Sequence, residues 1–146
     1  MNKLLFLCTG NYYRSRFAEM YFRHLAAQRG LDWEAESRGL RLCPGNEGSL
    51  SCFTEQECAR LGIAIEPMRF PQSLSEADLE TADLTIAVKE TEHRSLMQAN
   101  FPRWENGIEY WEIHDIDVAT ADEAMPILRQ HVEALVHRLA DSATNP

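Results

Sequence analysis

Short apolar runs alternate along the chain with segments whose apolar residues recur every three or four positions. Runs at residues 3–8, 84–88 and 108–113 predict buried strands, and residues 33–37 and 63–65 are weaker strand candidates. The helical spacing predicts five helices: one that ends at Gly30, one that ends at Leu61, two at about 76–80 and 90–99, and one after Thr120. This order predicts a parallel sheet with helices on both faces, whose ligands bind at the carboxyl ends of the strands.

Capping residues mark the helix ends. The second helix can begin at Ser51 or at Thr54, since both residues suit an N-cap. Thr120 and Glu123 predict the start of the last helix, where Pro126 would kink the helix or reset its start. Irregular chain is expected at residues 39–51, Pro67 and Pro71.

The composition indicates one globular domain over residues 1–146, since 45% of the residues are apolar and 25% are charged. A net charge of -9 disfavours nucleic acid and anionic membranes as partners. The longest apolar run near the start, residues 4–8, is too short for a membrane span or an export signal, so we expect a cytoplasmic protein. We expect its cysteines to be reduced thiols without the spacing of a metal site. They are Cys8, Cys43, Cys52 and Cys58.

Residues 8–15, with the sequence Cys-Thr-Gly-Asn-Tyr-Tyr-Arg-Ser, connect the first strand to the first helix, and we call them the anion loop. If this loop curls around the start of the helix, its backbone N–H groups converge and form a site for a dianion. Arg14 would add two hydrogen bonds to that anion. The same field favours the thiolate of Cys8, which makes this residue a candidate nucleophile.

The residues around Cys8 and Arg14 favour a functional interpretation of the pair. On a structural interpretation, Cys8 is a core residue at a strand end and Arg14 is a surface charge, and their spacing alone is weak evidence against this. However, none of the other cysteines has an arginine six residues later. Gly10 and Asn11 suit a tight loop, and Ser15 can donate a hydrogen bond to the sulfur.

The anion loop resembles that of the low-molecular-weight protein tyrosine phosphatases. Their loop has the form Cys-x-Gly-Asn-x-x-Arg-Ser, and the helix after it carries Ala-Glu, as residues 18–19 do here. Further segments are similar to the family, so that the resemblance covers nearly the whole chain: residues 36–39, 77–79, 82–84 and 92–94. The resemblance implies a single three-layer α/β domain with a central four-stranded parallel sheet flanked by helices. It also implies that Cys8 and Arg14 are catalytic and that the other loop residues bind the substrate: Thr9, Gly10, Asn11, Tyr12, Tyr13 and Ser15.

A two-step thiol mechanism also needs an acid that protonates the leaving oxygen and then activates water. In the family this acid is an Asp followed by Pro, near the C-terminus and after a strand. Asp115 is the better positional match here and Asp117 is the alternative, although neither precedes a proline. On a structural interpretation both are solvated acids beside the last helix. We expect Asp115 to be the acid because this fold places catalysis at strand ends.

The sequence departs from the family pattern beside the anion loop. Tyr13 stands where many relatives have a second cysteine that can trap the oxidised enzyme as a disulfide. Arg16 follows the loop serine, where the family often has proline, and would either widen the positive mouth of the site or lie on the helix surface. Ile116 and Val118 stand near the positions of aromatic residues that hold a phosphotyrosine ring in the family. Either Tyr12 or Tyr13 recognises the ring instead, or the substrate is not a phosphotyrosine.

The predicted function is a phosphomonoesterase, in particular a protein tyrosine phosphatase, that forms a cysteinyl-phosphate intermediate without a metal or other cofactor. The nearest alternative is a thiol-dependent arsenate reductase, in which Cys43, Cys52 or Cys58 would carry the oxidation away. The third is a non-catalytic module that binds phosphorylated partners. We expect a monomer or weak dimer that acts on a phosphorylated protein or a small phosphomonoester.

Overall fold

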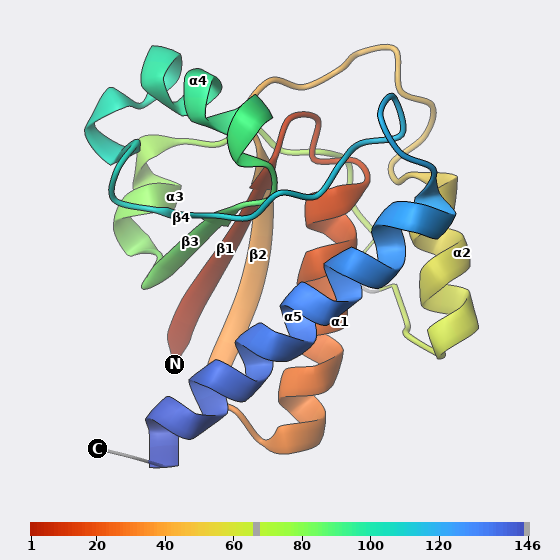
Figure 1. Ribbon diagram of the computed structural model, residues 1–146, viewed down its shortest axis with the longest axis vertical. Coiled ribbons are helices and arrows are strands. Elements are labelled where there is room, and N and C mark those ends of the chain that lie inside the picture. Colours follow the sequence, from red (N-terminus) through yellow and green to blue (C-terminus); the bar gives the residue numbers. More distant parts are fainter. Residues whose placement is uncertain (66–67, 145–146) are drawn as a thin grey trace.

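A four-stranded parallel sheet forms the centre of the protein in the computed structural model, which describes residues 1–65 and 68–144 (Figure 1). Its strands are β1 (Asn2–Cys8), β2 (Trp33–Gly39), β3 (Leu84–Ala87) and β4 (Glu109–Tyr110), in the order β2-β1-β3-β4. All three pairings are parallel, and Cys8 lies opposite Gly39 at the carboxyl end of β1. The predicted sheet is confirmed.

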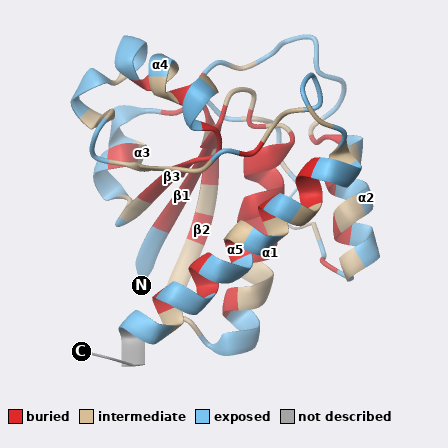
Figure 2. Cartoon of the chain, viewed as in Figure 1, coloured by how far each residue is buried: buried red, intermediate tan, exposed pale blue. Residues whose placement is uncertain are grey.

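Helices cover both faces of this sheet. On one face lie α1 (Arg14–Arg29), α2 (Cys52–Leu61) and α5 (Ala121–Thr144), and on the other lie α3 (Glu76–Thr81), α4 (Glu90–Asn100) and a 3-10 helix (Pro102–Trp104) (Figure 1). Side chains alternate along β1, so that Leu4 and Phe6 enter the core shared with α1 and α5, whereas Leu5 and Leu7 enter a second core. Buried residues accordingly follow β1, all sides of the first half of α1 (residues 14–22) and one side of α5 (Figure 2). Burial of each leucine or phenylalanine side chain of β1 contributes about 1.5–3 kcal/mol to the free energy of unfolding.

The end of α2 explains why one predicted strand is absent. Gly62 has a φ of 73° and follows the last helical residue, and the N–H of Ile63 donates to the carbonyl of Cys58 over 2.8 Å. This is a Schellman motif, in which the residue after the glycine closes the helix. Ile63 is buried and its backbone caps α2, so residues 63–65 form no strand, and the prediction of one was wrong.

The structure also settles where two helices begin. The hydroxyl of Ser51 accepts the N–H of Phe53, so Ser51 is the N-cap of α2, while Thr54 lies inside the helix. At α5, Thr120 and Glu123 form the predicted reciprocal cap. This helix continues through Pro126, which does not reset its start.

Two further sequence predictions have different outcomes. The predicted strand at residues 108–113 is reduced to Glu109–Tyr110, followed by an isolated bridge between Lys89 and Glu112. Pro67 lies outside the described residues.

Candidate active site

The anion loop turns its carbonyl groups outward and leaves amides free. The carbonyls of Cys8, Thr9, Tyr12 and Tyr13 accept hydrogen bonds of 2.9–3.0 Å from groups outside the loop, which belong to Leu40, Arg41, Ser51 and Thr54. Within the described residues, the N–H groups of Gly10, Tyr12 and Tyr13 have no acceptor. The loop leads into the N-terminus of α1, whose first turn contains no acidic residue. Free amides at the positive end of a helix form a site for an anion.

The sulfur of Cys8 receives hydrogen bonds from two loop residues. The N–H of Asn11 lies 3.2 Å from Sγ, and the hydroxyl oxygen of Ser15 lies 2.9 Å from it. Because Ser15 Oγ already accepts from the side-chain amide of Asn11 over 2.9 Å, its own proton is free for the sulfur. Two donors are therefore directed at the sulfur of the candidate nucleophile.

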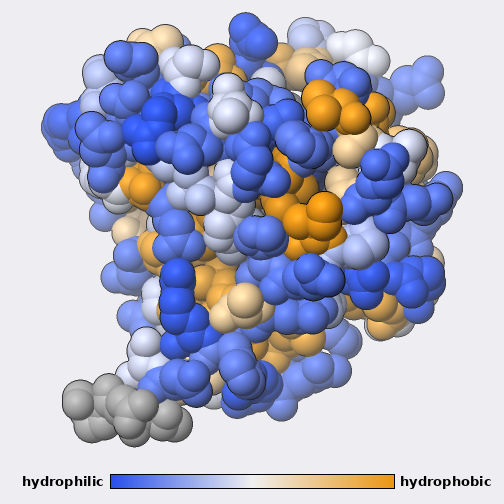
Figure 3. Space-filling model, viewed as in Figure 1, coloured by the Kyte–Doolittle hydropathy of each residue, from blue (hydrophilic) through white to orange (hydrophobic). Residues whose placement is uncertain are grey.

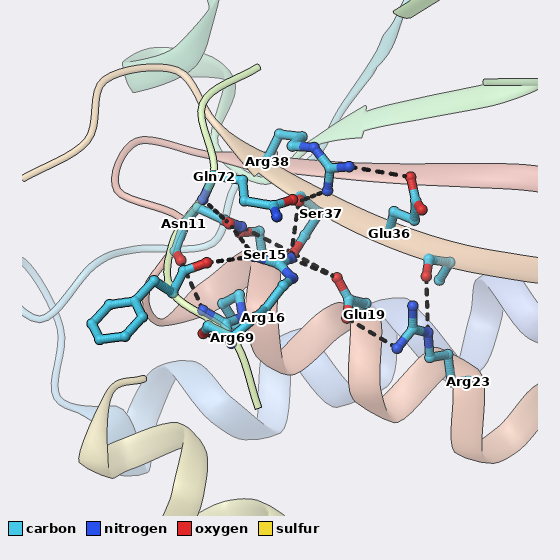
Figure 4. A network of polar contacts seen from close by, with 12 residues as sticks. Asn11, Ser15, Arg16, Glu19, Arg23, Glu36, Ser37, Arg38, Arg69 and Gln72 are labelled. Atoms are coloured by element: carbon cyan, nitrogen blue, oxygen red, sulfur yellow. Dashed lines mark hydrogen bonds and ion pairs between the residues drawn. The ribbon is translucent and has the colours of Figure 1, made fainter. Parts of the chain in front are cut away.

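The side chain of Asn11 holds the shape of the loop through contacts with other segments of the chain (Figure 4). It is fully buried and has a φ of 50°, a left-handed conformation that asparagine adopts more readily than most other residues. Its Oδ1 accepts from Arg69 Nη1 and from the N–H of Gln72, both over 3.0 Å, and its Nδ2 also donates to Ser37 Oγ over 2.9 Å. The turn is therefore fixed by β2 and by the segment before α3.

Arg14 lies almost completely buried between the loop and the C-terminal half of the chain. Its Nη1 donates to the carbonyl of Ile113 over 3.0 Å. Its Nη2 lies 2.8 Å from Glu92 Oε2 and 3.3 Å from Asp115 Oδ2. Burial opposes protonation, but attraction to Cys8, Asp115 and Glu92 outweighs burial and raises the pKa of Arg14. The guanidinium is thus a permanent positive charge at the site.

Both candidate acids line one cleft of about 640 Å³ together with Cys8. Asp115 contacts Arg14, and its second carboxylate oxygen, Oδ1, accepts the N–H of Ile116 over 2.8 Å. Asp117 lines the cleft three residues before Thr120, the N-cap of α5. The contact with Arg14 supports Asp115 as the catalytic acid, which stays a prediction.

The sequence of this chain also matches a known protein family. Residues 3–142 match the model of the low molecular weight phosphotyrosine protein phosphatases. The chain belongs to this family. Its members are cysteine-dependent phosphatases, and this chain is an enzyme of that class.

Individual proteins that are similar to this chain are also named phosphatases. The chain is 29% identical over 105 residues to a protein-arginine-phosphatase of Bacillus subtilis, which covers 72% of this chain and 67% of that protein. It is 37% identical over 94 residues to the low molecular weight protein-tyrosine-phosphatase YfkJ of the same organism, over 60% of this chain and 56% of that protein. The crystal structure of YfkJ superposes with a TM-score of 0.83 at 25% identity and covers 97% of this chain and 96% of that chain.

Sequence reasoning missed how this phosphatase holds its arginine. In the sequence, Glu92 and His93 belong only to a segment similar to the family, yet in the structure they connect the anion loop to α4. Glu92 accepts from Arg14, from the hydroxyl of Thr9 and from His93 Nε2. His93 Nδ1 accepts the N–H of Lys89 over 3.0 Å, so its proton is on Nε2 and points to Glu92. A usable signal was their place in the first turn of a helix that follows a parallel strand.

Both sequence expectations for Arg16 are wrong. The side chain is 1% exposed, so it neither widens the mouth of the cleft nor lies on the helix surface. Its guanidinium donates to backbone carbonyls instead. The reason is that the segments around Ser49 and Arg69 cover this side of α1, which local sequence does not reveal.

The remaining loop and cysteine residues have distinct places. Tyr12 and Tyr13 both line the cleft, and the hydroxyl of Tyr12 donates to the carbonyl of Glu47. Tyr13 is mostly buried and its ring packs against Phe53. Burial, followed by the charge of Asp115, raises the pKa of Tyr13 to about 12. Cys43 and Cys52 line the cleft, and Cys58 is buried in the core. All four cysteines are free. Among the described residues, no three His, Cys, Asp or Glu side chains gather as metal ligands, and no helix is long and apolar enough to cross a membrane.

One edge of the cleft is apolar. Ile116 and Val118 are more than half exposed in the loop before α5. The surface in Figure 3 is mostly hydrophilic, and a hydrophobic patch lies over this loop at the upper right. Ile116, which lines the cleft between Asp115 and Asp117, therefore places apolar surface beside the two acids.

Proposed function

We propose that this phosphatase hydrolyses aryl phosphomonoesters, with the phosphotyrosine of a protein as its substrate class. The observation that carries the proposal is the position of the Cys8 sulfur in a loop with three free amides and two donors, beside the buried cation Arg14. Such a site binds a phosphoryl dianion and places the nucleophile against phosphorus.

In the first step, the thiolate of Cys8 attacks phosphorus while the bond from phosphorus to the ester oxygen breaks. Asp115 gives its proton to that oxygen, and the alcohol or phenol leaves. In the second step, the carboxylate of Asp115 takes a proton from water, the water oxygen attacks the cysteinyl phosphate, and the sulfur leaves as a thiolate. The products are inorganic phosphate and free enzyme. Arg14 and the amides of the loop bind the phosphoryl oxygens in both steps.

The walls of the cleft support an aromatic substrate. Tyr12, Phe53 and Ile116 line it, and the exposed Val118 follows two residues later in the same loop. A phenyl ring would bury area against these residues. Because the nucleophile must stay a reduced thiol, we infer that the enzyme works in the cytoplasm.

Phosphoarginine in a protein is the second candidate substrate. A relative with 29% identity is named a protein-arginine-phosphatase, and the carboxylates of Glu92, Asp115 and Asp117 line the cleft, where a guanidinium could pair with them. Release of phosphate from matched phosphotyrosine and phosphoarginine peptides distinguishes the two candidates.

Turnover of p-nitrophenyl phosphate tests the proposed chemistry. The wild type should release p-nitrophenol, Cys8→Ser should not, and Cys43→Ser, which changes an exposed thiol at the same cleft, should retain activity. Turnover by the Cys8→Ser enzyme at the wild-type rate would disprove the mechanism. Loss of activity in Cys43→Ser alone would assign the chemistry to a different thiol.

A further inference from the structure

Arg16 lies beside Asn11 and Arg69 (Figure 4), and it is not among the residues that line the cleft. It belongs to the first turn of α1, two residues after Arg14, and its side chain is 1% exposed. No step of the mechanism above uses it. A buried cation in this position needs an explanation, because burial of an arginine side chain is costly unless its charge is compensated.

The guanidinium of Arg16 joins three separate segments through their carbonyl oxygens. Nη1 lies 2.9 Å from the carbonyl of Ser49 and 3.4 Å from that of Asn11, and Nη2 lies 2.8 Å from the carbonyl of Arg69. The segment that contains Ser49 forms a wall of the cleft, since Arg41, Cys43, Asn46 and Ser51 line it. The segment that contains Arg69 holds the side chain of Asn11. Arg16 therefore fixes the anion loop relative to both of its supports.

One of these contacts acts on the anion site through a single peptide group. The carbonyl of Asn11 and the N–H of Tyr12 are the two ends of one peptide unit. Arg16 donates to the carbonyl end, and the N–H end is one of the free amides of the anion loop. A cation at the carbonyl polarises the peptide group and makes its N–H a stronger donor toward a bound anion.

Arg16 makes no ion pair within the described residues, although the charge of Glu19 attracts it. Glu19, the nearest acid along α1, pairs with Arg23 and Arg69. Burial, followed by repulsion from Arg69, lowers the pKa of Arg16 to about 10, which leaves it protonated at neutral pH. A positive charge therefore lies behind the loop, where it attracts a dianion through the peptide backbone.

We propose that Arg16 is a positioning residue for phosphate binding: it holds the outer side of the anion loop and strengthens the loop amides without touching the substrate. This proposal rests on the proposed function, because the bound anion is the phosphoryl group of the substrate. It assigns to this chain a buried arginine where the family often has proline.

Phosphate affinity in Arg16 variants tests this role. In Arg16→Met the dissociation constant of inorganic phosphate should rise about tenfold, because the loop amides lose the polarising charge behind them. The KM for p-nitrophenyl phosphate should rise with it, and Arg16→Lys, which keeps the charge, should recover part of the affinity. A merely structural role would lower the melting temperature and the yield of folded enzyme without changing phosphate affinity per folded molecule.

Arg23→Met is the matched control. Arg23 lies on the same helix, pairs with Glu19 over 3.3 Å and donates to the carbonyl of Ala35 over 2.9 Å, so it makes similar contacts away from the anion loop. It should bind phosphate as the wild type does. If Arg16→Met is folded and binds phosphate with wild-type affinity, or if Arg23→Met loses as much affinity, the proposal is overturned. Where Arg16→Met does not fold, Arg16→Gln, which keeps a donor and removes the charge, is judged by the same two results.

The binding measurement is made by calorimetry and needs no turnover. Weakened phosphate binding in Arg16→Met together with an inactive wild type would contradict the proposed function and support the role of Arg16. Normal turnover in the wild type together with unchanged phosphate binding in Arg16→Met would support the proposed function and contradict the role of Arg16.

Discussion

Arg14 Nη2 donates a hydrogen bond of 2.8 Å to Glu92 Oε2 across 78 residues of sequence. Glu92 is itself held by the hydroxyl of Thr9 and by the ring of His93. Burial would raise the pKa of Glu92, but the hydrogen bonds from His93, Thr9 and Arg14 outweigh it and bring the pKa well below its usual value. A carboxylate that is always ionised and fixed in place sets the plane of the Arg14 guanidinium before a substrate arrives.

Glu92→Gln should weaken catalysis and stability together. The amide carries no charge and places an NH₂ group among the donors of Arg14 and His93, so Arg14 loses its fixed orientation. We expect kcat/KM for p-nitrophenyl phosphate to fall about tenfold and the free energy of unfolding to fall by about 1–3 kcal/mol. Steady-state kinetics and urea unfolding measure these changes. An unchanged kcat/KM would show that Glu92 has no part in orienting Arg14.

Asp115→Asn should slow the first chemical step most for poor leaving groups. Asparagine has no proton to give to the ester oxygen, and phenol is harder to expel without one than p-nitrophenol. We expect the rate with phenyl phosphate to fall by about 100-fold or more, within the usual range for a general acid, and the rate with p-nitrophenyl phosphate to fall less. Asp117→Asn is the matched control, because Asp117 lines the same cleft. The assignment of the acid is wrong if Asp117→Asn produces this dependence on the leaving group instead.

Ser15→Ala should slow release of phosphate from the sulfur. The hydroxyl of Ser15 accepts from Asn11 and directs its proton to Cys8 Sγ, so it stabilises the thiolate that leaves in the second step. Loss of a hydrogen bond to a charged group costs about 1.5–3 kcal/mol, which is about a tenfold or greater fall in the rate of that step. Rapid-mixing kinetics with p-nitrophenyl phosphate should show a burst of p-nitrophenol close to one per enzyme, followed by slow turnover. A slow first step with no burst would contradict this role.

His93 should make the enzyme less stable as the pH falls below about 6.5. Burial, followed by the charge of Arg14, lowers the pKa of His93 from its ordinary value of 6.5 despite the hydrogen bond to Glu92. The unfolded chain therefore takes up this proton at a higher pH than the folded chain. The contribution of neutral His93 to the free energy of unfolding is complete above pH 6.5. It decreases by up to about 1.4 kcal/mol per pH unit as the pH falls toward the folded-state pKa of His93.

Urea unfolding at several pH values between about 5 and 8 checks this pH dependence. His93→Gln should show a flatter profile than the wild type. His137→Gln, which replaces an exposed histidine, should keep the wild-type profile. The explanation fails if the two variants have the same slope.

Most elements of the fold could be read from local patterns because each depends on neighbours in sequence. The run that ends at Cys8 is buried on both faces, so β1 formed as expected. At residues 63–65 the same reasoning failed, because an apolar run of three residues also fits the end of a Schellman motif, and the backbone of Ile63 closes α2. At residues 108–113 the pairing partner β3 is only four residues long, and regular pairing stops accordingly.

The chemistry of the site divides in the same way. The thiol, the free amides, Asn11, Ser15 and the start of α1 belong to one stretch of eight residues, which is why the sequence alone predicted them. The contacts that hold this loop in shape come from distant segments near Ser37, Arg69 and Gln72. The contacts of Arg14 with Glu92 and Asp115 span 78 and 101 residues, and the burial of Arg16 depends on segments near Ser49 and Arg69. Those relations arise only when the packing of strands and helices brings distant segments together, because the energy that selects them comes from burial and charge in the folded core.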